Sequence, residues 1–275
     1  MKLKREDMYQ QHWKKFHKAV CSINFYGKTN SKILALTGFR VGDQIITDDQ
    51  TYNPKEATEI KIRFYDEDGF KIFREFVYSW NEFKSLLPPK SEFENLGIAM
   101  FSLKDEDLDG TSSLELCNSC NAAIGKEAFT ISYQYDQNNL ALKSALISSN
   151  YINERKLSYI QFDGTVRPGI SGSPLIDYEG GKVLGIVTNK EHKIVKSYRE
   201  IINNIDQNLS TLETVKGKWF VDDVDPIQVL IVNQNQLKHF SREFFSNFAI
   251  KNGYALDINH LREYLEGNSE MDFEE

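Results

Sequence analysis

The sequence is poor in cysteine, with only Cys21, Cys117 and Cys120 among its 275 residues. So small and odd a number cannot form the disulfide framework that small secreted domains need, and we therefore expect reduced cysteines. Cys117 and Cys120 have the spacing of half a zinc site or of a redox pair. Because no second Cys/His pair follows and no βαβ pattern surrounds them, we interpret them as a chance pair in a loop, with metal or redox chemistry as the alternatives.

Long apolar runs and an excess of positive charge are also missing. No segment approaches the roughly 20 apolar residues that cross a bilayer, and the charged N-terminal stretch lacks the apolar core of a secretory signal. We therefore expect a cytoplasmic protein that does not contact membranes. A formal net charge of −7 at pH 7, with no basic stripe to offset it, makes nucleic acid an unsuitable partner.

What the sequence does contain is a series of short strand patterns, separated by turns rich in glycine, proline and acidic residues. This rhythm is typical of antiparallel β-barrels, and the strands fall into two groups. The first group comprises 19–26, 33–41, 44–47, 58–65, 70–78 and 96–103. The second comprises 127–135, 140–149, 157–162, 173–178 and 182–188, with a last short strand at 253–256.

Helical periodicity marks the rest of the chain, at 6–18, 194–215, 226–248 and 258–265. The predicted organisation begins with an N-terminal extension (1–18), a first β-barrel (19–103), a linker (104–126) and a second β-barrel (127–193). A helical insertion (194–250), a final strand with its helix (251–266) and an acidic tail (267–275) follow.

One segment carries a chemical signal: Arg167-Pro168-Gly169-Ile170-Ser171-Gly172-Ser173-Pro174-Leu175, between two predicted strands. A nucleophilic serine must stand on a tight turn whose N–H groups point at the developing oxyanion, and a Cβ on either side would obstruct it. Glycines flank Ser171 in this way. The alternative interpretation is an ordinary hairpin turn, since glycine, serine and proline are common there.

This segment resembles the G-x-S-G-[GS]-P signature of trypsin-like serine proteases, especially their HtrA-type bacterial branch. Leu36–Thr47 resembles the strand pair before the family's histidine, and Asn252–Leu256 resembles its closing strand. The resemblance covers about residues 19–190 and 250–266. It implies an all-β core formed by a trypsin-like double antiparallel β-barrel, with a helical insertion and a C-terminal helix.

The resemblance also assigns the catalytic positions. Ser171 takes the nucleophile position, Gln50 replaces the histidine that follows Ile46-Thr47, and Asn95 replaces the aspartate that opens the D-[LI]-[AG]-[LI]-[AL] strand. A serine hydroxyl is a weak nucleophile without an adjacent base, and glutamine has no basic lone pair near neutral pH. Among the histidines, His192 is the least unsuitable substitute, and we interpret it as an ordinary loop residue.

The same resemblance implies the rest of the site. The N–H groups of Gly169 and Ser171 would form the oxyanion hole, and Thr165 would lie at the base of the primary pocket. Val187, Thr188 and Asn189 would line the substrate groove, where a peptide could add as a strand.

These assignments favour a catalytically inactive pseudoprotease that binds a peptide or protein. The alternatives are an active serine endopeptidase with a nonstandard or partner-supplied base, and a scaffold subunit that binds through the helical insertion. No metal or cofactor is expected, because Asp105–Gly110 only begins like a calcium loop and the position of its bidentate carboxylate falls on Leu116.

Overall fold

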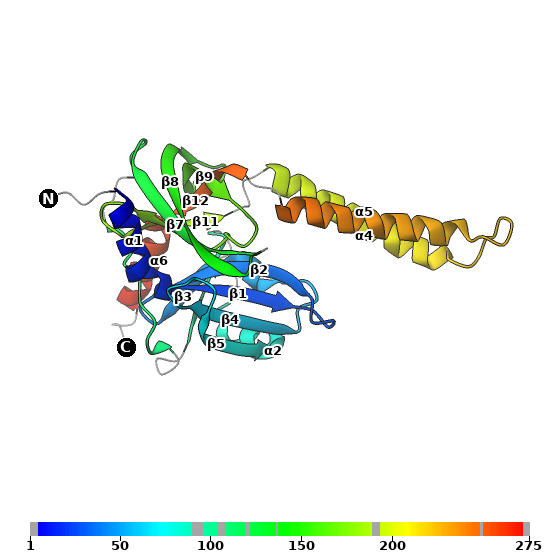
Figure 1. Ribbon diagram of the computed structural model, residues 1–275, viewed down its shortest axis with the longest axis horizontal. Helices are drawn as coiled ribbons and strands as arrows, with labels where there is room; N and C mark the ends of the chain where they lie inside the picture. Colours follow the sequence, from blue (N-terminus) through cyan, green and yellow to red (C-terminus); the bar gives the residue numbers. More distant parts are fainter. Residues whose placement is uncertain are drawn as a thin grey trace. The chain divides into compact units, whose positions relative to one another are not determined.

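The computed structural model describes residues 5–89, 96–103, 108–118, 122–135, 137–188, 193–247 and 250–271. Contacts divide the chain into two units. One unit consists of Met1–Thr188 together with Ala249–Glu275, and the other is Asn189–Phe248. The strands named below belong to the first unit, whereas the second is a pair of helices (Figure 1).

The first six strands form one antiparallel sheet with the order β5-β4-β1-β2-β3-β6. Its inward side chains form a buried core with Ile23, Phe25, Ile62 and Phe64 at the centre. The strands are β1 (Val20–Tyr26), β2 (Lys32–Val41), β3 (Gln44–Asp48), β4 (Glu59–Tyr65), β5 (Ile72–Ser79) and β6 (Ile98–Ser102).

This sheet differs from the expected barrel in two respects. Over the described residues, its ladder runs from β5 to β6 without closing. A helix that the strand patterns did not predict, α2 (Trp80–Leu86), follows β5 and begins with a capping box between Ser79 and Glu82. Its Phe83 is completely buried, with its ring centre 5.2 Å from that of Phe101, so α2 contributes to the core of the open sheet.

The second group of strands forms a closed barrel with the order β10-β11-β12-β9-β8-β7. The strand that follows the helical pair in sequence, β12, closes it by pairing with both β11 and β9. This confirms the expected last strand. The members are β7 (Glu127–Gln134), β8 (Asn139–Ile152), β9 (Ser158–Val166), β10 (Pro174–Asp177), β11 (Val183–Thr188) and β12 (Ile250–Asp257).

Two further helices, besides α2, belong to the first unit, in agreement with the helical patterns at its ends. Helix α1 (Arg5–Phe16) packs on the barrel through His12 and Phe16, which stack on Phe129 of β7. Helix α6 (Ile258–Met271) follows β12 directly.

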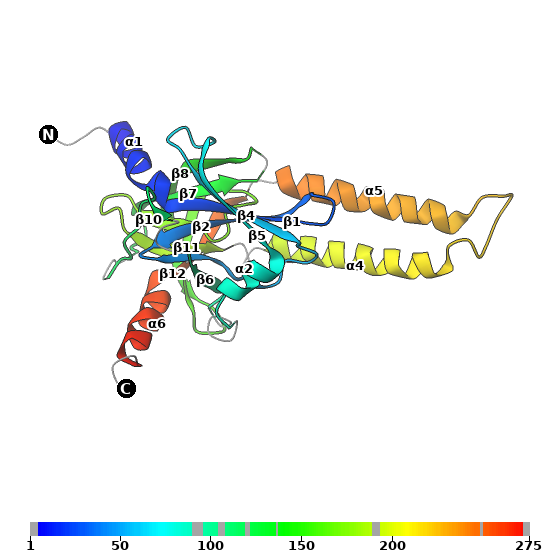
Figure 2. The ribbon, with the colours of Figure 1, turned by 90° about the horizontal axis from the view of Figure 1, so that it is seen from below.

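The second unit is a hairpin of α4 (Lys193–Val215) and α5 (Pro226–Asn247), which lie side by side along their length in both views (Figures 1 and 2). The rings of Tyr198 and Phe245 stack with centres 4.1 Å apart, and Lys238 bonds to Asp206. None of the helices in the described part of the chain is long and apolar enough to span a membrane.

The cysteines depart from the expectation. Cys117 is disulfide-bonded, so the prediction of a reduced thiol is wrong for this residue. Cys120 lies outside the described residues, whereas Cys21 is a free, buried thiol. The cytoplasmic location stays a prediction.

Candidate functional site

The predicted nucleophile turn lies between β9 and β10, and its glycines are there for steric reasons. Gly169 has a φ of +98° and Gly172 a φ of +86°, in the region that side chains with a Cβ rarely adopt. A Cβ on Gly169 would lie 2.6 Å from Tyr133 O, and one on Gly172 would lie 2.2 Å from Thr37 O. Both positions therefore require glycine, as the turn argument predicts.

A single threonine ties this turn to the first sheet. Thr37 on β2 donates its N–H to Ser171 O over 2.9 Å and its hydroxyl to Gly169 O over 2.6 Å. The same hydroxyl accepts the N–H of Tyr133, on β7 of the closed barrel, over 2.9 Å. Because Thr37 is completely buried, these bonds are shielded from water and fix the turn against both β units.

The hydroxyl of Ser171 is buried, with 3% of the residue exposed. Its Oγ has no hydrogen-bond partner among the described residues. In the same part of the chain, no protein acceptor is seen for the N–H groups of Gly169 and Ser171, the two predicted oxyanion donors. The turn thus presents a hydroxyl without an attached base.

The end of β3 lies against this turn, and the predicted base position follows it two residues later. An ideal Cβ on Gly172 would lie 2.6 Å from Thr47 Oγ1 and 2.8 Å from Asp48 N. Gln50 is half-buried in the short 3₁₀ helix that follows, and its Nε2 donates to Asp48 Oδ1 over 3.0 Å. The amide of Gln50 is therefore bound to a carboxylate.

Asp48, like Thr37, is a site residue that the sequence patterns missed. Only 1% of it is exposed, and its Oδ1 also accepts the backbone N–H of Gln50 over 3.0 Å. Its Oδ2 lies 3.4 Å from Thr188 Oγ1 on β11. In sequence it filled one of two polar positions before the expected histidine, and nothing about a lone aspartate there indicates a buried carboxylate.

The other predicted positions fall in different environments. Asn95 and Asn189 lie outside the described residues, although β6 begins opposite Asp48, three residues after Asn95. Thr165 is exposed on β9. Val187 is buried, and its backbone N–H and C=O are bonded to Ser173 O and Gly172 N.

No described histidine of the first unit is placed as a base for Ser171. His12 bonds to Tyr178 O, His17 Nδ1 lies 2.8 Å from Trp13 O, and His260 Nε2 accepts the N–H of Ser158. His192 lies outside the described residues. Cys21 offers no alternative nucleophile, because burial raises the pKa of its thiol and keeps it protonated.

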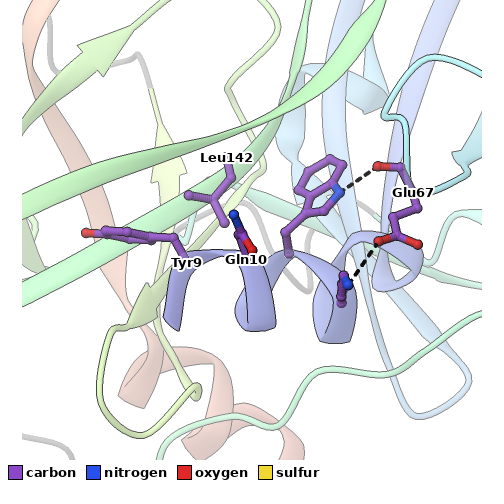
Figure 3. A pocket seen from close by; sticks show the side chains of 6 residues that line it. Tyr9, Gln10, Glu67 and Leu142 are labelled. Carbon is purple, nitrogen blue, oxygen red and sulfur yellow. Dashed lines mark hydrogen bonds and ion pairs between the residues drawn. The ribbon is translucent and has the colours of Figure 1, made fainter. Parts of the chain in front are cut away.

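A hollow of about 370 Å³ lies elsewhere on the first unit, beside α1 (Figure 3). Tyr9 and Leu142 line it, and Glu67 receives a hydrogen bond from Trp13 and an ion pair from Lys14. It contains none of the predicted site residues. Among the described residues, no group of acidic, histidine or cysteine side chains is arranged to hold a metal ion.

Comparison with known proteins gives one family and a set of folds. The model of the trypsin-like peptidase domain matches residues 36–186, more than half of the chain. No curated protein matches it.

The solved structures that this chain resembles include three proteins of low sequence identity. Rv3671c from M. tuberculosis H37Rv, in the inactive form of a serine-to-alanine mutant, is 12% identical and matches with a TM-score of 0.54 over 97% of this chain and 94% of that one. Deg5 is 17% identical over 69% of this chain and 89% of its own, with a TM-score of 0.49.

The HtrA-type protease AlgW with a tripeptide is 18% identical over 66% of this chain, with a TM-score of 0.48. The match covers 54% of AlgW, so the chain spans about half of that protein. The match to Rv3671c, with a TM-score of 0.54 at 12% identity, shows a shared fold and leaves activity open.

Proposed function

The chain belongs to the trypsin-like peptidase domain family, and from this premise we propose that it is a pseudoprotease that binds a peptide or protein without cleaving it. The site keeps the glycine turn and Ser171, but the position that the resemblance assigns to the base holds Gln50. Binding and catalysis are separable in such a site, because the fold and the groove do not depend on the base.

One observation carries the proposal: the hydroxyl of Ser171 has no hydrogen-bond partner in the described chain. In addition, the amide of Gln50, at the position of the base, is bound to Asp48. Attack by serine needs a base within hydrogen-bond reach to take the hydroxyl proton. Removing one member of a catalytic triad lowers the rate by several powers of ten. A site of this kind retains at most the residual effect of oriented N–H groups.

The backbone of β11 limits where a ligand could pair. Val187 already bonds to the nucleophile turn on one side and pairs with Ala255 of β12 on the other. A peptide that adds as a strand could therefore not use the backbone of Val187, and strand addition along this segment stays a prediction.

The test is hydrolysis of a mixed peptide library by the purified chain, with Ser171→Ala as the matched control. We expect the same background cleavage from both proteins and the same affinity for any retained peptide. Cleavage that disappears in Ser171→Ala would instead establish the active endopeptidase.

A second candidate function, a scaffold that binds through the helical hairpin, is favoured by the outer surface of α5. Apolar side chains on this helix remain 46–67% exposed, although neighbouring positions pack against α4. Leu230, Leu237 and Phe244 lie seven residues apart, with Phe240 between the last two, which is the spacing of a helix-pairing seam. We call Leu230, Leu237, Phe240 and Phe244 the α5 outer row, and we infer that it would fit an apolar helix of another protein.

A further inference from the structure

We propose that Asp48 has taken over the role of the carboxylate that orients residue 50, so that the site lacks a base but not the orienter of a base. The inference rests on the proposed function, because it takes position 50 as the place of the lost base. It makes Asp48 a positioning residue, which acts through residue 50 and not on a substrate.

The hydrogen bonds of Asp48 match this role. A catalytic histidine is held by a buried carboxylate that accepts the ring N–H facing away from the serine. Asp48 Oδ1 accepts both the backbone N–H and the side-chain Nε2 of Gln50, each over 3.0 Å. A planar side chain at position 50 is therefore already bound by a carboxylate through its nitrogen.

The location of Asp48 is also suitable. Its backbone nitrogen lies against Gly172, the residue after Ser171, so the carboxylate and the nucleophile turn belong to one region. Thr188 approaches Oδ2 from β11, and Ile98 of β6 is paired directly with Asp48. The carboxylate is thus enclosed by the strands from which the resemblance draws the groove and the family's aspartate.

The simpler explanation is that Asp48 caps the short helix Asp49–Tyr52, since its side chain accepts the N–H of Gln50. A cap accounts for that bond alone. It does not require 99% burial, a bond from the side chain of Gln50, or a contact with Thr188, which is 140 residues away in sequence. Burying a carboxylate is costly unless several donors satisfy it, and residue 50 and Thr188 of β11 supply donors here.

The inference predicts that Gln50→His alone would place an imidazole on an existing carboxylate. A carboxylate within about 4–6 Å stabilises the charged form of an imidazole and raises its pKa, typically by one or more units. The experiment compares three proteins by NMR titration of the introduced imidazole: Gln50→His, Gln50→His with Asp48→Asn, and Gln50→His with Asp49→Asn.

Asp49→Asn is the matched control, because it removes the same charge from the neighbouring residue. We expect Asp48→Asn to lower the pKa of the introduced imidazole. The resulting loss of proton affinity should be at least tenfold larger than the loss caused by Asp49→Asn. If Asp48 were only a helix cap, Asp48→Asn would lower the unfolding free energy whether residue 50 is glutamine or histidine. The difference in pKa between the Asp48→Asn and Asp49→Asn proteins would then be small. Equal effects of the two substitutions, in proteins that unfold cooperatively, would overturn the proposal.

Should Asp48→Asn prevent folding, Thr188→Val gives a second measurement. Removal of the hydroxyl frees Asp48 from one donor and leaves its charge, so the pKa of the introduced imidazole should stay raised. An unraised pKa in both Gln50→His and its Thr188→Val derivative would also overturn the proposal. Neither result depends on whether the unmodified chain cleaves peptides, so failure of this inference is distinct from failure of the pseudoprotease proposal.

Discussion

The hydroxyl of Thr188, at the end of β11 in the closed barrel, lies 3.4 Å from Oδ2 of Asp48, at the end of β3 in the open sheet. This contact joins the closed barrel to the open sheet. The nucleophile turn is hydrogen-bonded to both of them in the same region. The neighbouring link is Thr37, whose backbone N–H and hydroxyl bond to the turn. The candidate site is therefore built from polar side chains that bridge the open sheet and the closed barrel of the first unit.

The first prediction concerns Thr37. Thr37→Val keeps the shape but leaves Gly169 O and the N–H of Tyr133 without their partner in a buried position. Unsatisfied buried groups cost about 1–3 kcal/mol each, so we expect the unfolding free energy to fall by about 2 kcal/mol or more in urea denaturation. Thr37→Ser is the control and should recover most of the loss, because it retains the hydroxyl. Equal stability of the valine and serine variants would contradict the bridging role.

The second prediction compares two glycines with positive φ. A Cβ on Gly172 would meet Thr37 O at 2.2 Å, whereas one on Gly42, with a φ of +61°, would meet nothing within 4 Å. Gly42→Ala should therefore cost only the backbone strain of about 1–2 kcal/mol. Gly172→Ala must in addition displace β2 from the turn, and we expect a clearly larger loss of stability or failure to fold. Similar thermal midpoints for the two variants would show that the turn is not packed as described.

The third prediction is a pH effect at α1. Burial is the largest influence on His12 and lowers the pKa of its ring, although the bond to Tyr178 O acts in the opposite direction. The unfolded chain, with a histidine pKa of about 6.5, then binds more protons than the folded chain as the pH falls below that value. The contribution of His12 to stability is thus full above about pH 6.5 and declines below it.

The measurement is the unfolding free energy of the unmodified chain and of His12→Gln between about pH 7.5 and pH 5. The glutamine variant should lose less stability over this range, while other histidines contribute equally to both proteins. A steeper loss in His12→Gln would mean that the folded protein favours the charged ring.

The fourth prediction tests the scaffold alternative through the α5 outer row. Leu237→Ser with Phe240→Ser changes residues that are 47% and 67% exposed, so stability should change by about 0.5 kcal/mol or less per site. Association with a helical partner should be lost, as measured by co-purification with the full chain. Asn235→Ser with Gln236→Ser, on exposed positions of the same helix, is the control and should retain the partner. If a partner still co-purifies with the Leu237→Ser, Phe240→Ser variant and its binding depends on the groove, the scaffold function is excluded.

The sequence was sufficient to predict most of the fold. Strand alternation and turn residues located the β segments, because these patterns are local. The helix α2 was missed since its signal, Ser79 followed three residues later by Glu82, is short, and the burial of Phe83 depends on distant residues. The opening between β5 and β6 was missed because sheet closure is a property of strands far apart in the chain.

The site was predictable to a smaller extent. The glycines around Ser171 follow from the geometry of any tight nucleophile turn, and their positive φ values agree with that argument. Asp48 and Thr37 were not predictable as site residues, because their importance comes from partners between 96 and 140 residues away. A disulfide at Cys117 likewise could not be inferred from so few cysteines.

Labelling with a fluorophosphonate probe tests the central claim most directly, since the probe reacts only with an activated serine. We predict no labelling of the unmodified chain or of Ser171→Ala, and labelling at position 171 in Gln50→His, where a base is restored beside Asp48. Labelling of the unmodified chain that disappears in Ser171→Ala would contradict the account, because it would show that Ser171 is activated without a histidine at position 50.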